Sequence, residues 1–112
     1  MKSRQLNKVV KATEALGWSV DVDDTLLSLN RHSPAGQDFW VELHAGNIAQ
    51  LAKELDDRYE GYDPSEEAYL WLDDSGHGVN GAPYDMGDVY ADTVWCKKAL
   101  GELAEAISEL VI

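Results

Sequence analysis

Cysteine is scarce in this chain, and the scarcity limits the chemistry available to it. One cysteine among 112 residues excludes an internal disulfide framework. Cys96 falls at an apolar position of a helical pattern, so we interpret it as a small buried hydrophobe. None of the three histidines, His32, His44 and His77, has a second His or Cys at the spacing of a zinc site. We therefore expect neither a zinc site nor a cofactor.

Other catalytic and metal-binding patterns are also missing. Asp73, Ser75 and His77 are spaced like the first ligands of a calcium loop, but Tyr84 stands where the closing acid belongs. A Ser75 nucleophile activated by His77 would lack the strand–turn–helix context and an oxyanion hole. We expect a protein that is not an enzyme and that holds no metal.

Long hydrophobic runs are absent as well. No segment approaches the roughly 18 apolar residues of a membrane span, and the charged N-terminus precedes an amphipathic stretch. We therefore expect a cytoplasmic protein with no signal peptide and no membrane contact. Its 45% hydrophobic content and ten aromatic residues distinguish it from a disordered acidic tail, and they predict a single domain over residues 1–112.

Basic residues are few and unevenly placed. Residues 1–17 hold four of the nine Lys and Arg side chains and one acid, whereas residues 18–112 hold five basic and twenty acidic side chains. A body with a net charge of −15 repels nucleic acid and anionic lipid, and it attracts basic protein surfaces. Arg4, Lys8 and Lys11 share one helical face, which we expect to dock onto the acidic body or to be solvated.

The period of the hydrophobic pattern changes along the first half of the chain. Helical spacing over residues 3–16, stopped by Gly17, predicts a first helix. Alternation over residues 18–23, 27–30 and 39–44 predicts three strands. Turns are expected at Asp23-Asp24 and at residues 33–36. Such short connections favour a three-stranded antiparallel meander.

The second half of the chain has helical spacing. Asn47 is a candidate N-cap for a helix that ends at Gly61, and Asp63 and Pro64 open a short third helix. A long loop follows over residues 73–83, and Asp85 begins a last helix. Two apolar stripes should be buried: Ile48, Leu51, Ala52, Leu55 and Tyr59 in the second helix, and Val89, Thr93, Cys96, Leu100, Leu103, Ile107 and Leu110 in the last. The predicted fold is α+β, in the order helix, three strands, three helices, with the helices packed on one sheet face.

Two surfaces are candidates for protein binding. The first is an acidic helical face made of Glu54, Asp57, Glu66, Glu67, Asp73, Asp74, Asp88, Asp92, Glu102, Glu105 and Glu109. The second combines the glycine-rich loop with nearby aromatics, namely His77, Asn80, Tyr62, Tyr69, Trp71 and Tyr84. A solvated acidic face, and an aromatic cluster packed beneath a simple connecting loop, explain the same residues without any partner. Trp40 points away from Phe39 and Val41, and it either packs under a helix or lies exposed.

Several short motifs resemble those of a group of small acidic proteins. They are the turn Ser33-Pro34-Ala35-Gly36 feeding a strand, the helix start Asp63-Pro64-Ser65-Glu66, the glycine-rich stretch 76–83 and the long final helix 85–112. The resemblance covers residues 18–110 and points to uncharacterised proteins of phages and conjugative elements of Gram-positive gut bacteria. No activity comes with it. It implies a context in which mobile elements encode acidic proteins that block host restriction or CRISPR nucleases, some by resembling the charge of DNA.

Two functions are therefore open. The first is a non-enzymatic acidic module of a mobile element that binds a basic protein surface, with a nucleic-acid-binding defence protein as the partner and without direct contact to nucleic acid. The second is a self-assembling structural or accessory protein, such as a homodimer, that uses the apolar seam of the final helix.

Overall fold

The computed structural model describes residues 3–34, 36, 38–44, 46–75 and 86–111, with the backbone alone for residues 71–75 and 86. Helices and strands follow in the predicted order, and the fold is α+β. The elements are α1 (Ser3–Ala15), β1 (Ser19–Asp23), β2 (Leu26–His32), β3 (Asp38–His44), α2 (Ile48–Gly61), α3 (Pro64–Ser75) and α4 (Met86–Glu109).

The three strands form one antiparallel sheet in the order β1-β2-β3. Asp23 pairs with Leu26, so the first turn consists of Asp24 and Thr25. The predicted turn at Asp23-Asp24 is therefore wrong by one residue. Asp24 has φ +57°, a left-handed conformation that Asp tolerates better than most residues and that suits the first position of this turn.

The second turn lies where it was expected. Gly36 has φ +87°, and its backbone N–H donates to the carbonyl oxygen of Ser33 at 2.9 Å. Past this turn, Phe39, Val41 and Leu43 are buried, while the residues between them are exposed. Strict alternation along β3 thus places one side of the strand in the core and the other in solvent.

Capping side chains fix the starts of α2 and α3. Asn47 Oδ1 accepts a hydrogen bond from the Gln50 backbone N–H at 2.9 Å, and Asp63 Oδ1 accepts one from the Ser65 N–H at 3.0 Å. Pro64 is the first residue of α3. The helix continues to Ser75, so residues 73–75 are helical and not part of a loop as predicted. The remainder of that loop, together with Asp85, lies outside the described residues.

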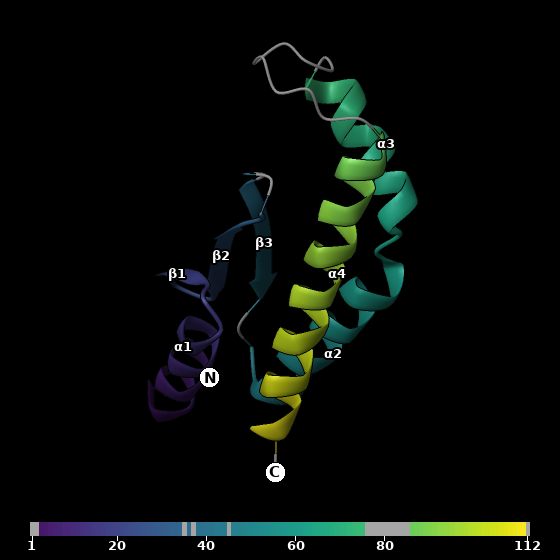
Figure 1. The fold of residues 1–112 in the computed structure, drawn as a ribbon. Coiled ribbons are helices and arrows are strands. Elements are labelled where there is room, and N and C mark those ends of the chain that lie inside the picture. Colours follow the sequence, from purple (N-terminus) through teal and green to yellow (C-terminus); the bar gives the residue numbers. More distant parts are fainter. Residues whose placement is uncertain (1–2, 35, 37, 45, 76–85, 112) are drawn as a thin grey trace.

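The helices lie on one face of the sheet. Figure 1 shows the long α4 running past the strands, with α2 beside it and α3 at the far end from α1. The core joins the buried side of the sheet to α1, α2 and α4. The predicted seam of α4 is confirmed as core from Val89 to Ile107, where every member is at most 2% exposed. Tyr59 does not belong to the buried stripe of α2 as predicted, because its side chain is 38% exposed.

Candidate protein-binding surface

The acidic residues are concentrated in one stretch of the chain. No Lys or Arg occurs between Arg58 and Lys97, whereas nine Asp and Glu residues do. This stretch forms the end of α2, all of α3 and the first half of α4. The basic helix α1 lies at the opposite end of the molecule from α3 (Figure 1). The acidic residues of α3 and the start of α4 therefore lie away from α1, whereas the C-terminal end of α4 lies at the same end of the molecule as α1 (Figure 1).

The predicted acidic face can now be placed residue by residue. Its exposed members are Asp57, Glu66, Asp88, Glu102, Glu105 and Glu109. Glu54 and Glu67 are half-buried, and the side chains of Asp73 and Asp74 lie outside the described residues. These residues come from three helices, and the exposed ones on α4 lie one turn apart from Glu102 to Glu109.

Few of these carboxylates are neutralised by a neighbouring cation. Asp57 pairs with Lys53 at 3.7 Å, and Glu54 pairs with Arg58 and His44, each at 3.7 Å. Among the residues that the structure describes, Glu66, Glu102, Glu105 and Glu109 form no ion pair. Their charge is therefore open to solvent and to any approaching protein.

The cations of α1 likewise form no ion pair within the described part of the chain. Arg4, Lys8 and Lys11 are all exposed. The sequence left two alternatives for these cations. The structure agrees with solvation and not with docking onto the acidic body. The cations of α1 therefore do not neutralise the carboxylates of the other helices through ion pairs among the described residues.

Among the members of the predicted acidic face whose side chains are described, Asp92 alone is buried. It is 4% exposed, and its Oδ2 accepts a hydrogen bond from the Ser33 hydroxyl at 2.5 Å. This bond joins the β2–β3 turn to α4 across 59 residues of sequence. Placing Asp92 on an exposed face was wrong, and the sequence held a warning: it lies three residues after Val89 and four before Cys96, on the buried side of the helix.

Cys96 lies close to Asp92, and burial together with this carboxylate keeps its thiol protonated. Burial and the nearby Asp92 carboxylate raise the pKa of the Cys96 thiol to about 12, because both disfavour the thiolate. Burial, followed by the proximity of Cys96 and Glu67, also raises the pKa of Tyr62. A protonated thiol is a poor nucleophile, so this cluster ties the sheet to α4 and offers no activated group.

The second candidate surface is only partly described. Tyr69 is 70% exposed on α3, whereas Tyr62 is half-buried and meets the Phe39 ring edge-on at 5.9 Å. The two tyrosines therefore do not share one exposed patch. The side chain of Trp71, and all of His77, Asn80 and Tyr84, lie outside the described residues, so the loop surface stays a prediction.

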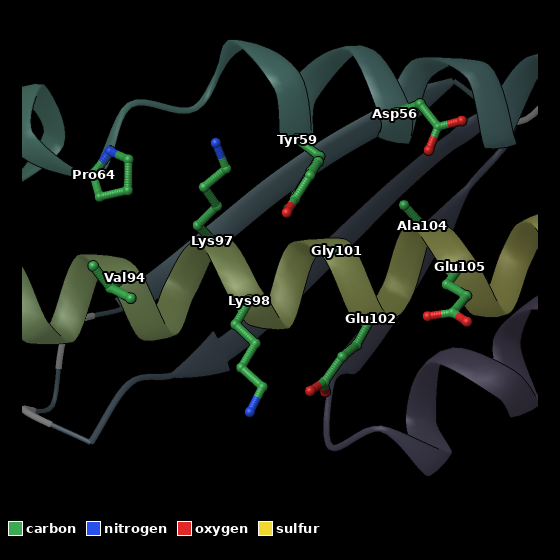
Figure 2. A pocket seen from close by; sticks show the side chains of 10 residues that line it. All are labelled: Asp56, Tyr59, Pro64, Val94, Lys97, Lys98, Gly101, Glu102, Ala104 and Glu105. Carbon is green, nitrogen blue, oxygen red and sulfur yellow. The ribbon is translucent and has the colours of Figure 1, made fainter.

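A groove of about 540 Å³ runs between α2 and α4 on the outer side of the helices (Figure 2). Its walls carry the carboxylates of Asp56, Glu102 and Glu105. Lys97 is held internally, because its Nζ donates to the Tyr62 carbonyl oxygen at 2.9 Å and lies 4.9 Å from the centre of the Tyr59 ring. Lys98, which is exposed, also lines the groove, so its walls carry charges of both signs.

Gly101 brings α2 and α4 close together at the middle of this groove. A Cβ atom at Gly101 would lie 2.7 Å from Cε2 of Tyr59, so the absence of a side chain lets the ring rest against α4 (Figure 2). The Tyr59 ring thereby fills the centre of the groove, which leaves a shallow, charged surface and no enclosed ligand site.

The open face of the sheet is a surface that sequence reasoning did not select. Trp40 is 58% exposed there, which decides between its two predicted environments. It also borders a hollow of about 360 Å³ beside β3, which Arg58, Tyr62 and Glu67 help to line. On the same face, Asn30 Nδ2 donates to Asp38 Oδ1, and His32 lies 4.0 Å from Asp38.

Within the described ranges, no group of three or more His, Cys, Asp or Glu side chains is placed to hold a metal ion. None of the helices in those ranges combines the length and the apolar character needed to cross a bilayer.

The chain was compared with models of protein families, with curated proteins and with solved structures, and nothing matches it. The function is therefore argued from the chemistry of its surfaces.

Proposed function

We propose that the protein is a non-enzymatic binding module that presents the acidic surface of α2, α3 and α4 to a basic surface of another protein. The observation that carries the proposal is the stretch between Arg58 and Lys97, which has nine acidic residues and no Lys or Arg. A net charge of −12 also exceeds the roughly 2–8 charges that solubility requires of a small domain. The excess favours fast, electrostatically steered association with a cationic partner.

The spacing of the carboxylates favours a partner that binds nucleic acid. Glu102, Glu105 and Glu109 follow one another along α4 at about 4.5 and 6 Å, given a rise of about 1.5 Å per residue. One DNA strand carries a phosphate roughly every 3.4 Å along its axis. The helix therefore carries a row of charge somewhat sparser than DNA, and a basic groove shaped for DNA would accept it.

The self-assembly alternative is less well supported than the binding module. It required the apolar seam of α4, and Leu100 and Leu103 of that seam are buried in the protein's own core. No observation favours it over the binding module, so a single function is proposed.

The test is a competition experiment with DNA. A short duplex bound to a purified basic DNA-binding domain is titrated with the protein, and release of the duplex is followed by fluorescence anisotropy. We expect release at about 50 mM salt and strong weakening at about 500 mM, because exposed charges are screened within a few ångströms at high ionic strength. The proposal is wrong if the protein releases no duplex at low salt.

A matched pair of variants separates the helical surface from net charge. Glu66→Gln with Glu105→Gln removes two charges from the proposed surface, whereas Glu14→Gln with Asp24→Asn removes two charges elsewhere. All four side chains are exposed. The first pair should weaken competition at least fivefold more than the second, and equal effects would show that only the total charge matters.

A further inference from the structure

The open face of the sheet forms a second, unpartnered surface on the side away from α2 and α4. Alternation sends every second residue of each strand to this side, and none of these side chains is buried. Four of them are acidic, namely Asp21, Asp23, Asp38 and Glu42. The strand residues on this face include no Lys or Arg, and Arg58 of α2 reaches the β3 edge of the face, where its Nη2 donates to the Glu42 carbonyl oxygen at 2.8 Å.

The register places two of these carboxylates on either side of a small residue. Asp21 pairs with Ser28, and Ser28 pairs with Glu42, so the three form one row across the sheet. Neighbouring strands lie about 4.8 Å apart, so the Cα atoms of Asp21 and Glu42 are about 10 Å apart. Neither carboxylate forms an ion pair with a described residue. The gap above Ser28 is therefore a place where one cationic group can meet two carboxylates.

Trp40 stands next to this gap. It lies two residues before Glu42 on β3, so its side chain is on the same side of the sheet as Asp21 and Glu42. At 58% exposure it is far more accessible than Trp18, which is 3% exposed beneath the sheet. A large, rigid aromatic ring held on a strand loses little freedom on binding, which is why tryptophan is enriched at energetic hot spots of interfaces.

We infer that this face binds an arginine-bearing segment of the basic partner, with the guanidinium between Asp21 and Glu42 and against the Trp40 ring. Arginine fits better than lysine, because its planar group bonds two carboxylates and stacks on an aromatic face. The inference rests on the proposed function for the basic character of the partner, and it adds a second contact surface, separate from the helices.

A second copy of the chain pairing face to face does not fit this surface. The same face of another molecule carries the same four carboxylates, and like charges directly opposed are repulsive. The exposed α1 cations of a second copy, Lys8 and Lys11 among them, are another source of positive charge for this face. Their contribution is tested below by the oligomeric state.

The experiment uses the full chain and a synthetic peptide of twelve residues in which Arg and Ser alternate, with matched Lys–Ser and Glu–Ser peptides. Amide and indole shifts of the ¹⁵N-labelled protein map the contact, and titration calorimetry gives Kd. We expect the largest shifts in β1, β2 and β3 and at the Trp40 indole. The Arg peptide should bind at least threefold tighter than the Lys peptide, and the Glu peptide should not bind.

Variants then assign the contact to its residues. Trp40→Ala should weaken binding at least tenfold, and so should Asp21→Asn with Glu42→Gln. The matched control, Glu14→Gln with Asp24→Asn, removes the same charge from exposed positions outside both proposed surfaces and should change Kd less than twofold. Because Trp40 is exposed, Trp40→Ala should keep the wild-type melting temperature. If Trp40→Ala lowers it, Asp21→Asn with Glu42→Gln still tests the surface independently.

The outcomes separate this inference from the proposed function. Shifts confined to α2, α3 and α4 overturn the sheet site and leave the helical module standing. A control pair as damaging as Asp21→Asn with Glu42→Gln also overturns the sheet site, because only the total charge would then matter. Absence of binding to the Arg peptide at low salt overturns both. Self-association that disappears in Lys8→Gln with Lys11→Gln would assign the face to a second copy and would also overturn the inference.

Discussion

The two sides of α4 have opposite chemistry over the same turns. Leu100, Leu103 and Ile107 point into the core and are at most 2% exposed, while Glu102, Glu105 and Glu109 point to solvent. One side stabilises the fold and tolerates no charge, and the other carries uncompensated charge that the fold does not use. Stability depends on one side of the helix and the proposed binding on the other, so each can be changed without the other.

The largest effect should come from moving charge to the buried side. Leu100→Asp places a carboxylate among the apolar side chains of the core, and we expect a loss of about 3–5 kcal/mol in the free energy of unfolding. Val94→Asp is the matched control, because Val94 lies on the outer side of α4 and is 42% exposed. Val94→Asp should lower the free energy of unfolding, measured by urea denaturation, by less than about 1 kcal/mol. Equal losses would mean that the two sides of α4 do not differ as described.

A smaller loss should follow from breaking the polar contact on the buried side. Asp92→Ala removes the acceptor of the Ser33 hydroxyl, and we expect a loss of about 2 kcal/mol, with about 1 kcal/mol for Ser33→Ala. Because the two groups bond each other, the double variant should lose less than the sum of the two. Denaturation of all four proteins measures the coupling, and strict additivity would contradict the bond.

Cys96, on the buried side, should make stability fall at high pH. Its folded pKa of about 12 exceeds the value of 9.0 for an unperturbed thiol, so the unfolded chain releases the proton first as the pH rises. The contribution is fully present below pH 9 and is lost between pH 9 and 12. At pH 10 the loss is about 1.4 kcal/mol. Unfolding at pH 8 and pH 10 should show a smaller drop for Cys96→Ala than for wild type, and equal drops would refute the raised pKa.

The fold followed from the sequence where local chemistry was decisive. Asn47 and Asp63 cap the helices as predicted, and Gly36 takes the positive φ that its turn requires. The first turn was misplaced because either Asp23 or Asp24 suits a turn chemically, and only pairing with β2 selects between them. Local sequence does not contain that choice.

The candidate surfaces were less predictable, because they depend on which side of an element faces a neighbour. Asp92 was placed with the exposed acids on residue type alone, although its helical phase put it with Val89 and Cys96. Trp40 was left between two environments because alternation gives its side of β3 but does not say whether a helix covers it. Both questions are settled by tertiary packing.

The smallest effect on stability should come from the exposed side of α4. Glu102→Gln with Glu109→Gln removes two like charges from a chain of net charge −12, so folding should be unchanged or slightly stabilised, by no more than about 0.5 kcal/mol. Raising the salt from about 20 to 500 mM should stabilise the wild type by more than this variant, since salt screens the same repulsion that the variant removes. Thermal melts at both ionic strengths measure the difference. A clear destabilisation of the variant at low salt would mean that these carboxylates hold the fold together, and the acidic surface would then owe its charge to stability and not to a partner.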